Sequence, residues 1–386
     1  MFIPFIFIVT NIAAEPEIVE EVLNFFDLDE SLQSIFEEFP LVSTEERDSQ
    51  YCENATEVVE IRLVDGKQYE KIMIEDDTTE YLIKDEFSGA MKRIILRPRL
   101  NCYDQDEKEL ADLVKDSLFH HPDPDRGYNI TNVYNTFPEE LYKEIKDSEE
   151  DLVNAVLDKI SKDWRDLSYP MYEEFFKDVK NGFFIEAGAS AGLDDSHTLL
   201  FESKLNWTGL LIEPCVNNLQ FLNRKAPHVF TCLATKDHPH YVNFENTLTQ
   251  LDDLDLQIMA GIVHEKTNTT YPRQCIPLYT LLLAAGNPTV HWFILDIEGA
   301  EFQVLQTIPW TQVDIEMISV ETDLAGLVME GSREEIIDYM RRQGYIHQNH
   351  KNIGNSIFED TVKDDLFIRE DVAKRYGLLV NEKSEL

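Results

Sequence analysis

The C-terminal part of the chain alternates short apolar runs with amphipathic segments, and this alternation restricts its fold more than any other feature. From Asn181 onward the apolar runs are GFFIEAG, TGLLIEP, HVFTCLA, VHWFILDIEG and VDIEMISVET. Segments with apolar residues at helical spacing lie between or after them: DSHTLLFESKL, VNNLQFLNR, EFQVLQTI and SREEIIDYMRRQ. Repeated strand–helix units of this size predict a mostly parallel sheet with helices on both faces. The last pieces, GYIHQ and DDLFIRE, predict a terminal hairpin.

The preceding part has a different pattern. EVVEIRLV and QYEKIMI flank an Asp-Gly turn and predict a hairpin, while TEYLIKD and KRIILRP predict further short strands. His120 and His121 lie in FHHPDPD, a Pro-rich stretch that predicts a loop rather than a metal site. We therefore expect a signal-peptide-like segment at residues 1–14, an acidic α+β region at 15–162 and an α/β domain at 163–386.

Composition supports a folded chain and limits its partners. The 386 residues are 43% hydrophobic and 11% aromatic, which is enough for a substantial core. The formal net charge is −40 at pH 7. A surface that acidic repels nucleic acid and anionic lipid headgroups, so we expect neither as a partner.

The first fourteen residues, MFIPFIFIVTNIAA, are apolar. They are too few to span a membrane as a helix, which needs about 20 residues. The run fits the apolar core of a secretory signal with cleavage near Ala14, although no Lys or Arg occurs before Arg47. A truncated membrane anchor and a cytosolic terminus remain alternatives, and we expect membrane attachment only if an anchor precedes Met1.

Three short patterns favour the secretory pathway. The chain ends in KSEL, which differs by one residue from the retrieval signal KDEL. Its five cysteines include no CxxC pair, so a zinc site is not expected. In an oxidising compartment, we expect disulfide bonds between Cys52 and Cys102 and between Cys232 and Cys275, which leaves Cys215 without a partner in this prediction. Glycosylation sequons begin at Asn54, Asn129, Asn206 and Asn268. We expect a location in the endoplasmic reticulum, Golgi or endosome, or secretion, with the cytoplasm as the alternative.

The strongest candidate site follows the first strand of the α/β domain. Ligands of open α/β sheets bind beyond the carboxyl ends of the strands, where Glu186, Gly188 and Gly192 lie. Glycines let the backbone turn tightly and approach a ligand. Glu213 ends the second strand, where a carboxylate can accept both hydroxyl hydrogens of a ribose. The pattern E-x-G-x-x-x-G favours S-adenosylmethionine over a dinucleotide, because G-x-G-x-x-G is absent.

The sequence here resembles a known family. NGFFIEAGASAG, HTLLFE and LNWTGLLIEP, with CIPLYTLLLAAGNPTVHWFILDIEGAEFQVLQTIPWTQVDIEMISVET, resemble the FkbM-type methyltransferase domain, and within it the Star-like branch. DIEGAE is the most specific segment. The resemblance implies a Rossmann-like S-adenosylmethionine methyltransferase fold with a mostly parallel seven-stranded sheet.

The resemblance also implies roles for individual residues. Glu186, Gly188 and Gly192 would shape the methionine and ribose pocket, and Glu213 would hold the ribose hydroxyls. Asp296 would face the transferred methyl group. The family is described as O-methyltransferases.

The expected chemistry agrees with these positions. Methyl transfer from a sulfonium is an in-line displacement, so catalysis is mainly alignment. A hydroxyl acceptor needs a proton acceptor, which Asp296 can provide, with Glu298 as the second expected catalytic acid. Glu298 and Glu301 have an alternative role, since acids at a helix start interact favourably with its dipole. A metal is not expected, because Asp296 and Glu298 have no evident third ligand.

Two positions depart from the family pattern. Ala191 stands where such loops usually carry an acid or amide, and Cys215 stands where a polar residue near the adenine is expected. Each change removes a hydrogen bond worth about 1 kcal/mol. Members of the Star-like branch look like trafficking factors. Two hypotheses follow: an S-adenosylmethionine-dependent O-methyltransferase acting on a hydroxyl-bearing substrate, or a non-catalytic secretory-pathway factor that carries secreted or membrane signalling proteins and has lost the cofactor.

Overall fold

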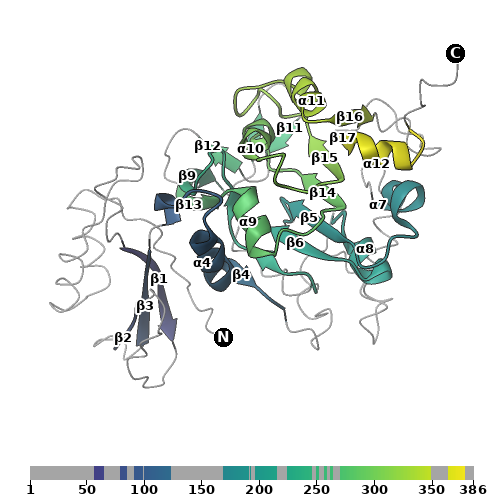
Figure 1. Cartoon of the computed structure of the whole chain (residues 1–386). Coiled ribbons are helices and arrows are strands. Elements are labelled where there is room, and N and C mark those ends of the chain that lie inside the picture. Colours follow the sequence, from purple (N-terminus) through teal and green to yellow (C-terminus); the bar gives the residue numbers. More distant parts are fainter. Residues whose placement is uncertain are drawn as a thin grey trace, which may run out of the picture. The chain divides into compact units, whose positions relative to one another are not determined.

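The computed structural model falls into two compact units (Figure 1). The smaller comprises Met1–Asp104, His238–Val242 and Pro272–Gln274, and the larger comprises Gln105–Asp237, Asn243–Tyr271 and Cys275–Leu386. The residues that the structure describes are 56–64, 79–84, 91–98, 100–122, 168–190, 192, 196–214, 224–245, 249–251, 256–258, 261–263, 270–348 and 364–378. The predicted segment 1–14 lies outside them, and the predicted boundary at residues 162 and 163 stays a prediction.

The smaller unit contains an antiparallel sheet of order β1-β3-β2. Its strands are β1 (Thr56–Val64), β2 (Thr79–Lys84) and β3 (Met91–Pro98). In this register Ile94 of β3 lies between Ile61 of β1 and Tyr81 of β2. The strands predicted from EVVEIRLV, TEYLIKD and KRIILRP are therefore confirmed, whereas the predicted partner QYEKIMI lies outside the described residues. A 3₁₀ turn, Leu100–Cys102, follows β3.

The larger unit is organised by a sheet of order β16-β17-β15-β14-β5-β6-β7-β4. Its five central strands, β15, β14, β5, β6 and β7, are parallel, and the outer pairings are antiparallel. The strand bounds are β4 Phe119–His120, β5 Phe183–Ala187, β6 Thr208–Ile212, β7 His228–Val229, β14 Trp292–Leu295, β15 Met317–Glu321, β16 Tyr345–Gln348 and β17 Asp364–Arg369. The predicted terminal hairpin is confirmed as the antiparallel pair β16–β17.

The prediction of a mostly parallel seven-stranded sheet needs correction. The described part of the sheet has eight strands and is mixed, with antiparallel pairings at both edges. The additional strand is β4, in which His120 pairs with His228 of β7. The sequence predicts a loop here, because two residues are too few to show strand alternation.

Two helix starts in the larger unit show how side chains set the residue at which a helix begins. α8 begins at Leu199, later than the DSHTLLFESKL pattern predicts, because the backbone of His197 and the side chain of Thr198 bind Glu186 instead. α11 begins after Ser332, which accepts a hydrogen bond from the Glu335 N–H. The helix bounds are α4 Lys108–Leu118, α7 Ser168–Met171, a π-helical turn Tyr172–Phe176, α8 Leu199–Leu205, α9 Leu278–Ala284, α10 Glu301–Thr307, α11 Arg333–Arg342 and α12 Glu370–Arg375.

The core of the larger unit is aromatic near β5 and β14. Phe176, Phe201 and Trp292 are fully buried, and Phe176 also packs against Trp207. The Trp292 Nε1–H donates to Ser319 Oγ at 2.9 Å, which satisfies its polar atom inside the core. Both tryptophans are thus core residues. Within the described residues, no helix has the length and apolar character needed to cross a membrane.

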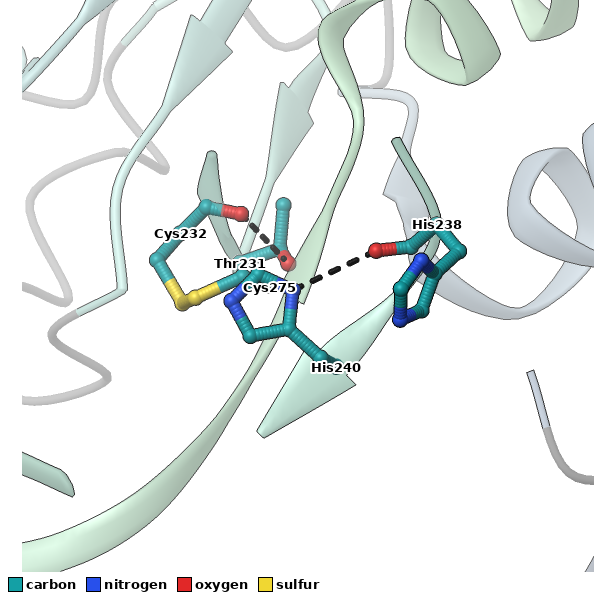
Figure 2. The surroundings of a disulfide bond; sticks show 5 residues. All are labelled: Thr231, Cys232, His238, His240 and Cys275. Carbon is teal, nitrogen blue, oxygen red and sulfur yellow. Dashed lines mark hydrogen bonds between the residues drawn. A yellow bond between two sulfur atoms is a disulfide. The ribbon is translucent and has the colours of Figure 1, made fainter. Parts of the chain in front are cut away.

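The apolar run HVFTCLA divides into two strands, β7 and β8 (Cys232–Leu233). β8 pairs in parallel with β13 (Thr270–Ile276), where Cys232 is opposite Cys275. These cysteines form the predicted disulfide bond, and Thr231 beside it donates to the Cys232 carbonyl (Figure 2). Cys102 is also disulfide-bonded, but Cys52 lies outside the described residues. The remaining strands are β9 His240–Glu245, β10 Thr249–Leu251, β11 Leu256–Ile258 and β12 Gly261–Val263.

Candidate functional site

The glycine loop follows β5 directly. Gly188 has φ +86° and Gly192 has φ +77°, a region that L side chains rarely adopt. The N–H groups of Gly188 and Ala189 both donate to the Ile212 carbonyl at the end of β6, at 3.0 and 3.2 Å. The loop therefore turns back over the carboxyl edge of the parallel strands, as its position in the sequence predicts.

Gly188 lies against the fourth predicted strand. A Cβ atom on this residue would be 1.7 Å from the carbonyl oxygen of Asp296, so a side chain does not fit. The Asp296 N–H donates in turn to the Ala187 carbonyl at 3.1 Å. The loop and the DIEGAE segment are thus brought together at one edge of the sheet.

Glu213 lies beside the same loop. It follows β6, is nearly buried and accepts a hydrogen bond at Oε2 from the Ser190 N–H at 2.9 Å. Ser190 also has a positive φ, +43°, which aims its N–H toward this carboxylate. Two of the predicted cofactor residues are therefore neighbours: Gly188 lies in the glycine loop, and Glu213 lies at the end of the adjacent strand β6.

Glu186 organises the segment that follows the glycine loop. Its Oε1 accepts from the His197 N–H at 3.0 Å, and its Oε2 accepts from Ser196 Oγ at 3.0 Å and from Thr198 Oγ1. The guanidinium of Arg224 lies 3.7 Å from Oε2. Both oxygens of this buried carboxylate accept hydrogen bonds from the segment after the glycine loop, so in the structure Glu186 holds that segment in place. Direct contact with a cofactor stays a prediction.

The DIEGAE segment forms a tight turn before α10. Glu298 has φ +62° and lies outside the helix, which begins at Glu301. Glu301 is 1% exposed, and its Oε1 accepts from the N–H groups of Ile297 and Gly299 at 2.9 and 3.1 Å. Burial raises the pKa of Glu301 to about 8, although these N–H groups oppose the increase. Glu301 therefore binds backbone N–H groups of the turn that precedes α10, whereas its interaction with the helix dipole stays a prediction.

Further carboxyl groups surround Asp296. Burial raises the pKa of Glu321, at the end of β15, and the charge of Asp296 and a hydrogen bond with it raise the pKa further. Burial raises the pKa of Asp364 to about 7; the positive charge of His197 opposes this increase, and the charges of Asp296 and Asp323 add to it. In the described part of the chain, no group of three or more His, Cys, Asp or Glu residues is arranged to hold a metal ion.

Several residues of this site escaped sequence analysis. Asp364 belongs to β17, far along the chain, and is brought in by its antiparallel register with Glu321. Ser196 and Arg224 carry no motif, and Thr198 lies in HTLLFE without a role assigned to it; only the fold shows that the three meet at Glu186. Contacts between residues that are distant in the sequence, whether through strand register or side-chain packing, leave no local sequence pattern that would predict them. Ala191 and Cys215, the two departures from the family pattern, lie outside the described residues.

The chain is similar to one protein family and to one solved structure. Residues 186–346 match the family model of the methyltransferase FkbM domain. A crystal structure of methyltransferase FkbM from Methylobacillus flagellatus KT is similar over 68% of this chain and 62% of that one, with 12% identity and a TM-score of 0.30. This chain thus spans less than two thirds of that structure, and no curated protein matches it significantly. The part of the chain that holds the candidate site, residues 186–346, is thus similar to the methyltransferase FkbM domain.

Proposed function

We propose that the chain is an S-adenosylmethionine-dependent O-methyltransferase that acts on a hydroxyl-bearing acceptor. The FkbM domain at residues 186–346 supports methyl transfer as the reaction. The observation that carries the rest is the contact between Gly188 and Asp296. It unites the glycine loop, Glu213 and the expected proton acceptor at the edge of an α/β sheet where ligands bind.

The residues at this edge fit the proposed cofactor. A carboxylate at the end of β6 suits a ribose diol, and the Ser190 N–H holds the Glu213 carboxylate beside the glycine loop. Gly188 and Gly192 supply positive φ angles, so the loop backbone approaches the site without a Cβ. When bound, S-adenosylmethionine supplies an electrophilic methyl group. Glu213 would bind its ribose, and the loop from Gly188 to Gly192 would surround its nucleoside and methionine parts.

Asp296 is the proposed proton acceptor. It is partly buried at the end of β14, where its charge raises the pKa of Glu321. The raised pKa favours the protonated form of Glu321, which can donate its proton in the hydrogen bond with Asp296. That bond orients the Asp296 carboxylate while it takes the proton of an acceptor hydroxyl. Glu298, in the same turn, stays the second expected catalytic acid.

The test is calorimetric titration of the full chain with S-adenosylhomocysteine. Glu213→Gln keeps an amide oxygen for the Ser190 N–H but removes the charge expected to hold the ribose, so we expect affinity to fall about tenfold or more. Glu316→Gln is the matched control, because this buried carboxylate binds Arg375 Nη2 at 2.7 Å and serves no proposed cofactor contact. Folded protein that gives no heat up to millimolar ligand would contradict the proposal and favour the non-catalytic trafficking factor.

We also propose a location in the secretory pathway. The support is the disulfide bond between Cys232 and Cys275, because disulfides persist in oxidising compartments and are rare in the cytosol. The bond joins two cysteines that are 43 residues apart in the sequence. A glycosidase-sensitive mass shift of the chain from animal cells, which becomes smaller when Asn206 is changed to Gln, would support this location. A reduced, unglycosylated chain in the cytosolic fraction would contradict it.

A further inference from the structure

Arg224 is a buried cation next to the glycine loop that sequence analysis did not single out. Its side chain is fully buried, although it lies just before β7, outside any described helix or strand. Its guanidinium carbon lies 5.7 Å from the centre of the Phe184 ring in β5. An arginine is rarely buried to this extent unless it is paired and hydrogen-bonded, so its partners indicate what it is used for.

One set of partners belongs to the chain that leaves the glycine loop. Nη1 donates to the Gly192 carbonyl at 2.7 Å and to Ser196 Oγ at 2.8 Å. Nη2 donates to Thr198 Oγ1 at 2.8 Å. One planar group thus binds both ends of segment 192–198, at distances typical of charge-assisted hydrogen bonds.

A second set of partners consists of two buried carboxylates. Nε donates to Glu202 Oε1 at 3.1 Å, and Nη1 lies 3.7 Å from Glu186 Oε2. Glu202, in α8, also accepts from the N–H groups of Lys225 and Ala226 at 3.1 and 2.9 Å. Arg224 therefore links the end of β5, the glycine loop, α8 and the approach to β7 in one network.

We propose that Arg224 is a positioning residue for the proposed cofactor site. It acts through the Gly192 carbonyl, which it fixes while Gly192 has a positive φ, and through Glu186, whose charge it balances. A loop that is already ordered binds a ligand more tightly, because binding then carries no entropy cost for ordering the loop. The inference rests on the proposed function for its ligand, but the ordering of the loop by Arg224 is testable without one.

The decisive variant is Arg224→Lys in the full chain. Lysine keeps the charge near Glu186 and Glu202, but an ammonium cannot reproduce the planar fork that reaches Gly192, Ser196 and Thr198 together. Arg369→Lys is the control, since Arg369 is also a forked arginine but binds Asp314 and Asp371 away from the glycine loop. If Arg224→Lys does not fold, Ser196→Ala is the milder variant: it removes one contact of the guanidinium, together with the hydrogen bonds of Ser196 Oγ with Glu186 and with the Thr198 N–H.

Two readouts separate positioning from general stability: affinity for S-adenosylhomocysteine and hydrogen exchange of residues 186–198. We expect Arg224→Lys to weaken binding about tenfold or more, with faster exchange in these residues and unchanged exchange in 292–305. Ser196→Ala should change both readouts in the same direction by less. The control should lower the melting temperature without changing affinity.

Each outcome decides one of the two proposals. If the wild-type chain binds no S-adenosylhomocysteine, the proposed function fails, and exchange alone tests Arg224. In that case, faster hydrogen exchange in Arg224→Lys that is confined to residues 186–198 still supports positioning of the loop by Arg224. Unchanged exchange and affinity in Arg224→Lys, or a rise spread equally over the larger unit, would overturn the inference.

Discussion

Gly188 packs directly on the Asp296 carbonyl, so closely that a Cβ on the glycine would be 1.7 Å from that oxygen. Two segments more than a hundred residues apart in the sequence therefore meet without an intervening side chain. This contact joins the loop proposed to bind the cofactor to the residue proposed to accept the proton. Loop and acid are then fixed relative to each other by the sheet itself.

Gly188→Ala should destabilise the larger unit by several kcal/mol, because backbone must move to admit the methyl group. Gly286→Ala is a matched control, since its φ of +89° is nearly that of Gly188 but nothing lies within 4 Å of its Cβ position. We expect the control to cost only about 1 kcal/mol from the unfavourable φ. Urea unfolding measures both, and equal losses would contradict the close contact.

Glu301→Gln should flatten the pH dependence of stability. The pKa of Glu301 rises from an ordinary 4.5 to about 8 in the folded chain, first because it is buried. Between these values the folded state binds more protons than the unfolded state, so stability falls as pH rises, by up to about 1.4 kcal/mol per pH unit. Glutamine keeps an oxygen for the N–H groups of Ile297 and Gly299 without this titration.

Urea unfolding from pH 4.5 to 8 measures this effect. The control is Glu330→Gln, at an exposed position, which should follow the wild-type curve. A Glu301→Gln curve parallel to that of the wild type would show that Glu301 does not retain its proton in the folded chain.

Asp365 should be the opposite case. Burial alone would raise its pKa, but hydrogen bonds from His347, Arg333 and Thr322 outweigh burial and hold the pKa at about 2. The Arg333 contact is bidentate, with Nε and Nη2 at 2.6 and 2.7 Å from the two oxygens. The stability that Asp365 contributes is therefore present above its unfolded pKa, ordinarily 3.8, and lost as pH falls toward 2.

Asp365→Asn should cost about 2 kcal/mol at pH 7, because it removes a buried carboxylate charge whose main partner, Arg333, is half exposed. The difference from the wild type should be smaller at pH 3, which lies below the unfolded pKa of Asp365. Asp338→Asn, which breaks the exposed pair with Arg341, should cost about 0.5 kcal/mol or less. Denaturant titrations at pH 7 and pH 3 compare the variants, and a loss that does not depend on pH would argue against the paired state of Asp365.

His228 should make the sheet edge sensitive to acid. The pKa of His228 is lowered from 6.5 to about 4, first by burial and then by the charges of the nearby His120 and His121. The His120 and His228 rings are 4.5 Å apart where β4 pairs with β7. Because the folded state binds fewer protons, stability should be lost as pH falls from about 6.5 to about 4.

The measurement for His228 is hydrogen exchange of residues 108–120 between pH 7 and pH 4.5, corrected for intrinsic rates. His228→Phe keeps a ring against Phe230, which packs 5.1 Å from His228, but does not titrate. We expect less acid-induced opening in this variant. Identical opening in the two proteins would place the acid sensitivity elsewhere.

The strands of the α/β domain were predictable because each is a short apolar run ended by a polar or glycine residue. β5, β6, β14 and β15 lie within the runs that sequence analysis named. The strand β4 was missed, because its two residues gain their pairing from β7 and not from a local pattern. The late start of α8 was missed too, since it depends on the buried oxygens of Glu186.

The candidate site was predictable only where it carries a motif. Gly188, Glu213 and Asp296 follow strand ends, and parallel strand ends meet at one edge of a sheet. Arg224 and Asp364 reach the site through tertiary packing, so nothing near them in the sequence marks their role. The use of the Glu186 carboxylate within its own loop was likewise visible only in the fold.

The most direct test of the account is hydrogen exchange of the full chain with and without S-adenosylhomocysteine. If the glycine loop, Glu213 and Asp296 form one cofactor site, the ligand should slow exchange in residues 186–198, 208–214 and 292–301. Residues 56–98 of the smaller unit and α11 should be unaffected. No protection at saturating ligand, or protection that spares the residues around Gly188 and Asp296, would contradict the account.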